Sequence, residues 1–501
     1  MKKHINIYLY FAALSLLVLS CVKDKGDYDY TEIPRITFED ATNTAKIFVR
    51  QGEPLKLSPG IQLNGNADDL SFEWFVYLNT QNASYMQDST LIATTQALDY
   101  IVDAEVFTIG EDYKLTYKVT NKQNGLSYFY FYQLTVSDLF TTGWIFLEDK
   151  QTQADLSMIL NDGTIYRNIY TDRNSSHPIS NPKSFTISSQ SITDDVGPNG
   201  KKYYLVGQHD AVELDGTTMT KRFNYDFLFF TAPDVFNPSY IAWGGGDGNS
   251  LGLLINDGHL HPNFVGGFPG AKKFSAQLKS PTYEYDYVLA PQHISGTGYS
   301  DTYNIIMYDQ RNKCFYNVVY NALRSFDTAV VDPAIFDMND VGLDLIKLDS
   351  SNVTEIRNAV MTDGAGTGYL LQFRTHRTAE QPIVTVNKQT IDAPGIASAA
   401  DVTCSTLSPH IFYVAGGKLY RYEVPSNTYT EEYALPAGEE LTQIKFQRHG
   451  YGNAQPRLIV CTWNGIEGKV YYFRVNPNGS LGELDKTYTG FGKIIDLAYK
   501  F

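Results

Sequence analysis

The chain has 501 residues, with 40 Lys and Arg against 55 Asp and Glu, which gives a net charge of −15. An apolar fraction of 43% with 39 Gly is that of a folded globular protein, not of a disordered or collagen-like chain. The acidic balance argues against a nucleic-acid partner and against attachment to an anionic membrane surface through basic patches.

Residues 1–20 have the pattern of an export signal. Lys2 and Lys3 precede an apolar stretch, Ile5 to Leu19, which is shorter than the roughly twenty apolar residues that a membrane span needs. A buried N-terminal helix or a single transmembrane anchor is the alternative interpretation.

The end of this stretch, Val18-Leu19-Ser20-Cys21, looks like a bacterial lipobox, which predicts cleavage before Cys21 and lipidation of its thiol. Two or three acyl chains on one residue give stable anchoring, whereas one chain does not. Residues 21–34 are charged and cannot pack, so we expect a tether. Acidic residues directly after the Cys resemble the export signals of surface lipoproteins in Bacteroidota. This resemblance implies that the protein is lipid-anchored in the outer membrane and faces the cell exterior.

Residues 35–138 show short runs of alternating apolar and polar residues, which predict strands. The runs at 113–120 and 128–136 are joined by a segment containing Asn124-Gly125, a typical hairpin signal. The length and spacing predict an immunoglobulin-like or PKD-like β-sandwich with Trp74 in its core. No Cys pair accompanies Trp74, so we expect no disulfide.

Residues 139–501 contain a repeated unit of an apolar strand, a tight polar turn and a second strand. Seven turn centres between positions 162 and 466 are separated on average by about 51 residues. This spacing leaves room for about four strands a unit and predicts a seven-bladed β-propeller. The segments 143–147 and 493–499 would complete one blade together. Two stacked β-sandwiches are the alternative.

Several short motifs carry a resemblance to a known family. They are the lipobox with its charged tether, the PKD-like module, Thr142-Gly143-Trp144 at the start of the repeats, and the segment 490–495 near their end. Together they resemble the PKD-like family lipoproteins of Bacteroidota. The resemblance implies a role beside a SusC/SusD-type uptake system in handling a glycan or peptide nutrient, and it brings no catalytic residues.

We find no complete catalytic or metal-binding constellation. His259 and His261 share a strand face, but no further ligand set accompanies them, so exposed strand residues are favoured. Glu284 and Asp286 are also expected on one strand face, where a solvated surface is favoured over a carboxylate pair. We expect no catalytic residues, metal or cofactor. The thiols of Cys314, Cys404 and Cys461 are expected in the core.

The segment Gly244-Gly245-Gly246-Asp247-Gly248-Asn249 is the most unusual loop. Its glycines allow a close approach of the backbone, either to a neighbouring blade or to a ligand. Trp243, Asp247 and Asn249 are therefore the candidate ligand-binding residues. A tight turn with Trp243 in the core is the favoured alternative.

Taken together, these patterns predict an all-β surface lipoprotein that acts as a non-enzymatic binding or accessory subunit of a nutrient uptake system. The alternatives are a propeller-type glycoside hydrolase or lyase, whose acids would converge from different blades, and a structural assembly subunit. Whether the protein is an enzyme stays open, with the balance toward a protein that is not one.

Overall fold

The computed structural model describes residues 35–39, 46–63, 69–79, 89–137, 140–188, 200–244, 251–264, 273–296, 303–319, 322–447 and 456–500. The chain divides into two compact units, Met1–Ser137 and Asp138–Phe501. The predicted signal peptide, the tether and Cys21 lie outside the described residues. Within the described part of the chain, no helix is long and apolar enough to cross a membrane.

The first unit consists of one larger sheet and two small ones. The larger sheet has the strand order β2-β9-β8-β5-β6, and the pairs β3-β7 and β1-β4 form the small sheets. The strands are β1 (Ile36–Phe38), β2 (Ile47–Arg50), β3 (Pro54–Leu57), β4 (Ile61–Leu63), β5 (Leu70–Leu78), β6 (Thr90–Ala93), β7 (Leu98–Ile101), β8 (Asp112–Asn121) and β9 (Ser127–Ser137).

Trp74 on β5 is fully buried, and its ring stacks on Tyr117 of β8 with centroids 4.3 Å apart. Ile36, Leu55 and Leu98 of the two small sheets belong to the same hydrophobic core. The small sheets therefore pack against one face of the larger sheet, and the prediction that Trp74 fills this core is confirmed.

The second unit consists, within its described residues, of seven antiparallel sheets that follow one another in chain order. Six of these sheets have four strands and the third has three. Their strands are β10 (Gly143–Lys150), β11 (Gln153–Leu160), β12 (Ile165–Tyr166) and β36 (Lys493–Lys500); β13 (Ser184–Ile187), β14 (Lys202–Val206), β15 (Ala211–Asp215) and β16 (Lys221–Asn224); β17 (Pro238–Gly244), β18 (Leu251–Asn256) and β19 (His259–Phe264); β20 (Ile294–Ser295), β21 (Ile305–Asp309), β22 (Cys314–Val319) and β23 (Ala322–Arg324); β24 (Asp344–Ser350), β25 (Ile356–Thr362), β26 (Gly368–Arg374) and β27 (Thr385–Ile391); β28 (Val402–Cys404), β29 (His410–Ala415), β30 (Lys418–Glu423) and β31 (Thr428–Ala434); β32 (Glu440–Gln447), β33 (Arg457–Trp463), β34 (Gly468–Val475) and β35 (Leu481–Phe491).

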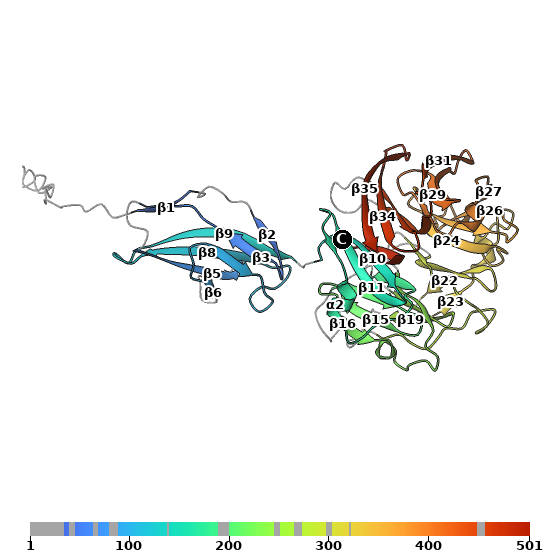
Figure 1. Ribbon diagram of the computed structural model, residues 1–501. Coiled ribbons are helices and arrows are strands. Elements are labelled where there is room, and N and C mark those ends of the chain that lie inside the picture. The colour runs from blue at the N-terminus through green and yellow to red at the C-terminus, as the bar shows by residue number, and fades with distance from the viewer. Residues whose placement is uncertain are drawn as a thin grey trace, which may run out of the picture. The chain divides into compact units, whose positions relative to one another are not determined.

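One edge strand of each sheet lies beside the corresponding strand of a neighbouring sheet. We call these the inner strands: β36, β13, β17, β20, β24, β28 and β32. In Figure 1 the colour of the second unit runs round from teal through green, yellow and orange to red, and the red strands lie beside the teal ones. The sheets thus follow one another in a circuit.

The circuit is joined by a pairing between the two ends of the unit. β36 pairs antiparallel with β10, from Gly143 opposite Lys500 to Asp149 opposite Lys493, with one bulge. Ile494 and Leu497 of β36 are buried against Trp144 and Phe146 of β10. The prediction that these two distant segments belong to one sheet is confirmed.

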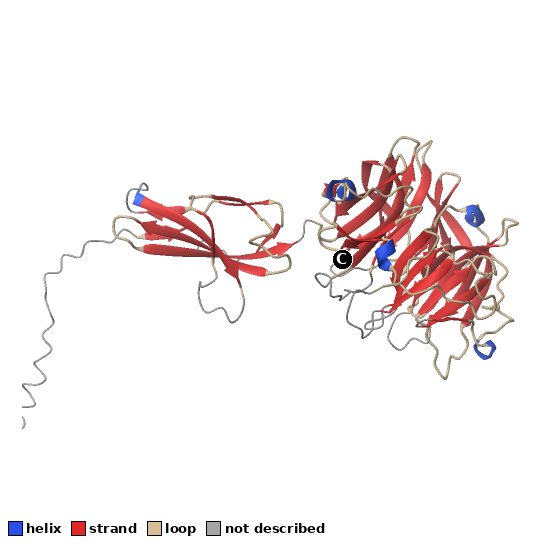
Figure 2. Ribbon diagram, turned by 90° about the horizontal axis from the view of Figure 1, so that it is seen from below, coloured by secondary structure: helices blue, strands red, loops and turns tan. Residues whose placement is uncertain are grey.

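Helices are few and short, as Figure 2 shows in blue. They are α2 (Ile169–Arg173) and the 3-10 turns η2 (Asp226–Leu228), η3 (Thr328–Val330) and η4 (Ile396–Ser398). The all-β prediction is confirmed. Cys314, Cys404 and Cys461 are free and buried, as expected for thiols within strand patterns.

One sequence prediction needs correction. The segment 283–287 is a turn and not a strand, because Glu284 has a positive φ of 53° and the chain reverses there. All seven predicted turn centres, near 162, 209, 257, 310, 376, 416 and 466, lie between neighbouring strands of one sheet. Those near 162 and 376 connect the third and fourth strands counted from the inner strand, and the other five connect the second and third. The equivalent hairpins are at 151–152 and at 363–367.

Candidate functional site

Side chains on the inner strands hold each sheet to the next. Asp349 of β24 accepts a hydrogen bond from the backbone N–H of Cys404 in β28 at 2.9 Å. Thr403 of β28 accepts one from the N–H of Phe446 in β32 at 3.0 Å. These acceptors satisfy backbone donors that the ladder of their own sheet leaves unpaired, which a buried N–H requires. The inner strands are thus cross-linked by side chains.

Similar links recur around the circuit. Asp401, just before β28, accepts from the N–H of Ile444 at 3.1 Å and pairs with Lys347 at 2.7 Å. Asp496 of β36 accepts from the N–H of Phe185 in β13 at 3.0 Å. Gln292, before β20, accepts from the N–H of Leu348 in β24 at 2.9 Å. Most polar side chains of the inner strands therefore have a structural role.

Lys445 of β32 departs from this pattern. It lies between Ile444 and Phe446, whose N–H groups are the ones that Asp401 and Thr403 bind. Its ammonium group can only donate, so it cannot link to a backbone N–H as its neighbours do. Lys445 also forms no hydrogen bond or ion pair with any residue in the described ranges. Its charge is left available.

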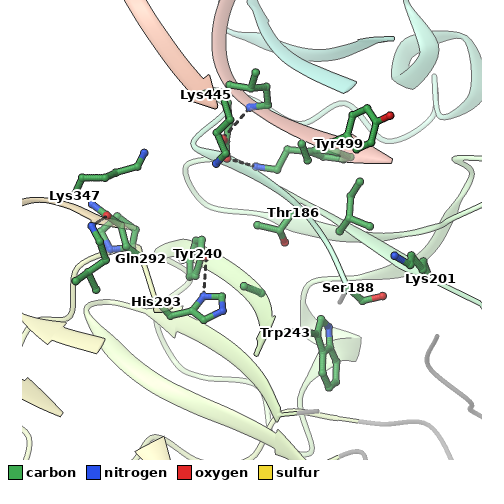
Figure 3. Close-up of a pocket in the computed structure, with 18 residues that line it drawn as sticks. Thr186, Ser188, Lys201, Tyr240, Trp243, Gln292, His293, Lys347, Lys445 and Tyr499 are labelled. Atoms are coloured by element: carbon green, nitrogen blue, oxygen red, sulfur yellow. Dashed lines mark hydrogen bonds between the residues drawn. The ribbon is translucent and has the colours of Figure 1, made fainter. Parts of the chain in front are cut away.

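A cavity of about 390 Å³ lies where the inner strands come together. Its walls come from β13, β17, β24, β32 and β36 and from residues 291–293 before β20. In Figure 3, Lys445 lies at the upper margin, Lys347 at the left, and Trp243 and Lys201 at the right. The volume is at the lower end of the roughly 300–1,000 Å³ found for small-molecule pockets.

The cavity contains more cationic than anionic side chains. Among the described residues, Lys201, Lys347 and Lys445 line it together with the carboxylate of Asp496, and the charge of Lys347 is offset by Asp401 outside the lining. Burial, together with the positive charge of Lys347, lowers the pKa of Lys445. Burial likewise raises the pKa of Asp496, although Lys445 opposes this shift. Both shifts are those of charges that are incompletely compensated.

Lys347 behaves differently from Lys445 although the two share the cavity. Burial alone would lower the pKa of Lys347, but the nearby carboxylates, Asp401 foremost, raise it. The ammonium of Lys347 is therefore held in its charged form by a partner that the protein supplies. Lys445 has no such partner at contact distance.

A neutral polar pair lies on another wall of the cavity. The hydroxyl of Tyr240 on β17 is 3.0 Å from Nδ1 of His293, and Figure 3 shows this contact as a dashed line. Burial lowers the pKa of His293 to about 4 and raises that of Tyr240. Both groups are therefore uncharged at neutral pH, and they add no charge to the cavity.

Of the residues predicted to bind ligand, Trp243 is at the end of β17 and lines the cavity. It is 5% exposed, and its ring packs beside Tyr204 and Phe274, so most of it belongs to the core. Asp247 and Asn249 lie outside the described residues. Of these three candidates, the described residues therefore place only Trp243.

The two other pairs considered in the sequence, His259 with His261 and Glu284 with Asp286, contact residues of the protein itself. Nε2 of His259 lies 2.8 Å from the carbonyl of Tyr285, and Nδ1 of His261 lies 2.9 Å from that of Ser275. His261 is buried, so the expectation that both are exposed is wrong for His261, whose strand face packs beside Phe229. Glu284 pairs with Lys279, and Asp286 with Arg311, at exposed positions. Among the described residues, no group of three His, Cys, Asp or Glu could hold a metal ion.

Sequence reasoning missed Lys347, Lys445 and Asp496, which the fold brings together from three distant segments. One signal was present: Lys445 interrupts the run Ile444-Lys445-Phe446 inside a strand pattern, as Asp496 interrupts Ile495-Asp496-Leu497. The signal is clear only for Asp496, which interrupts the apolar run 494–498, because charged residues are rarely buried. Lys445 stands in an alternating pattern, Gln443 to Gln447, that is typical of an ordinary strand.

Comparison with known protein families gives a match for the N-terminal part of the chain. A model of the PKD-like family matches residues 21–182. The N-terminal domain is PKD-like. The match continues past Ser137 into the first strands of the second unit. None of the curated protein sequences matches the chain.

Solved structures give only distant likenesses. A quinonprotein alcohol dehydrogenase-like protein from Bacteroides thetaiotaomicron is 12% identical, with a TM-score of 0.42, over 90% of this chain and 95% of that one. A protein from Lactobacillus plantarum is 12% identical, with a TM-score of 0.44, over 72% and 100%. A DUF4784 family protein from Bacteroides caccae is 10% identical, with a TM-score of 0.29, over 93% and 98%. At such scores these likenesses assign no activity.

Proposed function

We propose that this protein is a lipid-anchored, non-enzymatic binding protein whose second unit is a seven-bladed β-propeller with a ligand site on its axis. The observation that carries the proposal is the cavity of about 390 Å³ at the meeting of the inner strands. The circuit of sheets and the pairing of β36 with β10 support the propeller, because closure of the first blade with the last strand removes the free sheet edge.

The carboxylates near the cavity support binding rather than hydrolysis. A glycosidase needs two carboxyl groups roughly 5–10 Å apart that are free to act on substrate. Asp349 and Asp401 are engaged with backbone N–H groups, and Asp401 also with Lys347. Of these acids only Asp496 lines the cavity. One carboxyl group favours recognition of a ligand over acid–base catalysis.

A thermal-shift screen tests ligand binding. The full-length lipoprotein, purified from membranes in detergent, is melted with neutral and acidic mono- and disaccharides and with short peptides. A ligand at 100 times its Kd stabilises the native state by about 2.7 kcal/mol. We expect at least one compound to raise Tm by several degrees. A screen in which no compound changes Tm would contradict the proposed axial binding site.

The anchor and the uptake partner need a separate test. We propose that Cys21 is lipidated and that the protein faces the cell exterior beside a SusC/SusD-type transporter. Cells labelled with an alkyne fatty acid should label the wild-type protein but not Cys21→Ser. Intact cells treated with protease should lose the protein, and affinity purification from native membranes should retain a transporter. An unlabelled, protease-protected wild-type protein would refute this address.

A further inference from the structure

We propose that the ammonium group of Lys445 binds the carboxylate of a small monoanionic ligand inside the axial cavity. The two chemical sources of such a carboxylate are a sugar acid and the C-terminus of a short peptide. The inference rests on the proposed binding function and names the chemistry of its ligand.

Lys445 occupies a position in the circuit of inner strands at which its neighbours carry linking side chains. Its neighbours at the same level, Asp349 and Thr403, have acceptor side chains that bind the next strand. A Lys at this level makes no such link, and burying its charge disfavours the folded state. A residue that stabilises the fold less than its neighbours do is expected at a position where ligand binding requires that side chain.

Lys347 has a carboxylate at contact distance, whereas Asp496, the described carboxylate that lines the cavity, forms no ion pair with Lys445. Nζ of Lys347 lies 2.7 Å from Asp401, which is itself fixed by the N–H of Ile444. Lys445 forms no hydrogen bond or ion pair within the described part of the chain. A ligand carboxylate would give Lys445 the kind of partner that Asp401 gives Lys347.

Charge favours a monoanion over a dianion. Among the described residues that line the cavity, Lys347 is paired with Asp401, and Lys445 shares the space with the carboxylate of Asp496. A ligand carboxylate brings one negative charge to the ammonium of Lys445. A phosphate dianion would bring a second negative charge close to Asp496, which cannot move because it accepts from the N–H groups of Phe185 and Leu497.

The remaining walls suit a small polar molecule. Tyr240 and His293 are neutral, and Trp243 and Ala242 give an apolar side. Burial and the charge of Lys347 lower the pKa of Lys445, and the negative charge of a bound anion would oppose that shift. Charge-assisted hydrogen bonds are stronger than neutral ones, and they gain strength in a dry site.

The experiment is a cycle that changes the charge of the protein and of the ligand separately. Isothermal titration on the full-length protein uses glucuronate and its neutral methyl ester, and the tripeptide Ala-Ala-Ala and its C-terminal amide. The protein variants are wild type, Lys445→Met, Lys445→Arg and the control Lys388→Met, whose side chain lies on the outermost strand β27.

We expect the wild type to bind one acid at least 10-fold more tightly than its neutral counterpart. Lys445→Met should weaken the acid by a similar factor and leave the neutral compound unchanged. Lys445→Arg should retain most of the preference, and Lys388→Met all of it. Melting curves of each variant show that it is folded. The acid that binds identifies the source of the carboxylate.

Two results separate the inference from the function on which it rests. If the wild type binds the neutral compounds as tightly as the acids, or if Lys445→Met keeps the preference, the role of Lys445 is refuted while a binding cavity stands. If none of the compounds binds and the broader screen also finds no ligand, the proposed binding function is itself refuted. Tight binding of inorganic phosphate in place of either acid would also overturn the inference.

Discussion

Strand β36 is expected to hold the second unit closed, and removal of its buried side chains measures that role. Ile494 is fully buried and Leu497 is 3% exposed, both in the cluster that contains Trp144 and Phe146 of β10. Replacing a buried Ile or Leu by Ala costs about 2–5 kcal/mol. The double variant Ile494→Ala with Leu497→Ala should therefore lose about 4–10 kcal/mol.

This loss converts into a shift of the melting temperature. The entropy of unfolding is about 2.1 cal/mol/K per residue, so a unit of about 360 residues has about 0.76 kcal/mol/K. The double variant should melt about 5–13 °C below wild type. Circular dichroism at a strand-sensitive wavelength gives both curves. Deletion of residues 493–501 should lower Tm further, because the edge of β10 then also loses its hydrogen-bonding partner.

The matched control is Ile466→Ala, which removes the same atoms at a position that is 87% exposed. Surface substitutions stay within about 0.5 kcal/mol, so this variant should melt within about 1 °C of wild type. If the double variant melts no lower than this control, β36 does not close the circuit, and the reasoning from its pairing with β10 is wrong.

Four further predictions follow from individual side chains. The pKa of His293 is about 4 in the native state against about 6.5 when unfolded, so the unfolded state takes up the proton first as pH falls. This group should therefore reduce stability by about 1.4 kcal/mol per pH unit between about pH 6.5 and 4. Urea unfolding of His293→Asn should show a shallower decline of stability with pH than wild type. Asp401→Asn leaves the partly exposed ammonium of Lys347 without its contact partner, and chemical unfolding should show a loss of about 1–3 kcal/mol, whereas an unchanged midpoint would mean that the pair is not formed. Lys445→Met should raise stability by about 0.5–2 kcal/mol, because it removes a charge that burial disfavours; a lower Tm would argue that Lys445 is structural. Burial raises the pKa of Cys314 to about 11, so iodoacetamide at pH 8 should leave this thiol unmodified in the native protein and alkylate it in urea, with mass spectrometry of tryptic peptides as the readout.

Much of the fold was accessible from local patterns. Alternation of apolar residues located the strands around Trp74 and those of the second unit, and the pairing of β36 with β10 followed from the need to close a circuit of sheets. The hairpin at Gln151-Thr152 was missed because both residues have positive φ, 57° and 72°, without the Gly or Asn that normally signals such a turn. The hairpin at 363–367 contains Gly364 and Gly366 and could have been found.

The site was less accessible, because its members come from segments far apart in the chain. Lys347 and Lys445 each lie between apolar residues in the sequence. That pattern does not indicate that the two side chains are close enough for the charge of Lys347 to lower the pKa of Lys445. Which Lys has a counter-ion depends on the register between neighbouring sheets. That register places Asp401 beside Lys347, and no spacing in the sequence encodes it.

The pairing of β10 with β36 also has a consequence for synthesis and folding. Its partners are separated by about 350 residues, and ribosomes add about 5–20 residues per second. Synthesis of β36 therefore follows that of β10 by roughly 20–70 s. The PKD-like domain, whose contacts are all nearer in sequence, is able to fold during this time. During that interval a strand edge with unpaired backbone groups is open to wrong partners. The edge of β10 is thus exposed to wrong pairing until the chain has been made as far as β36.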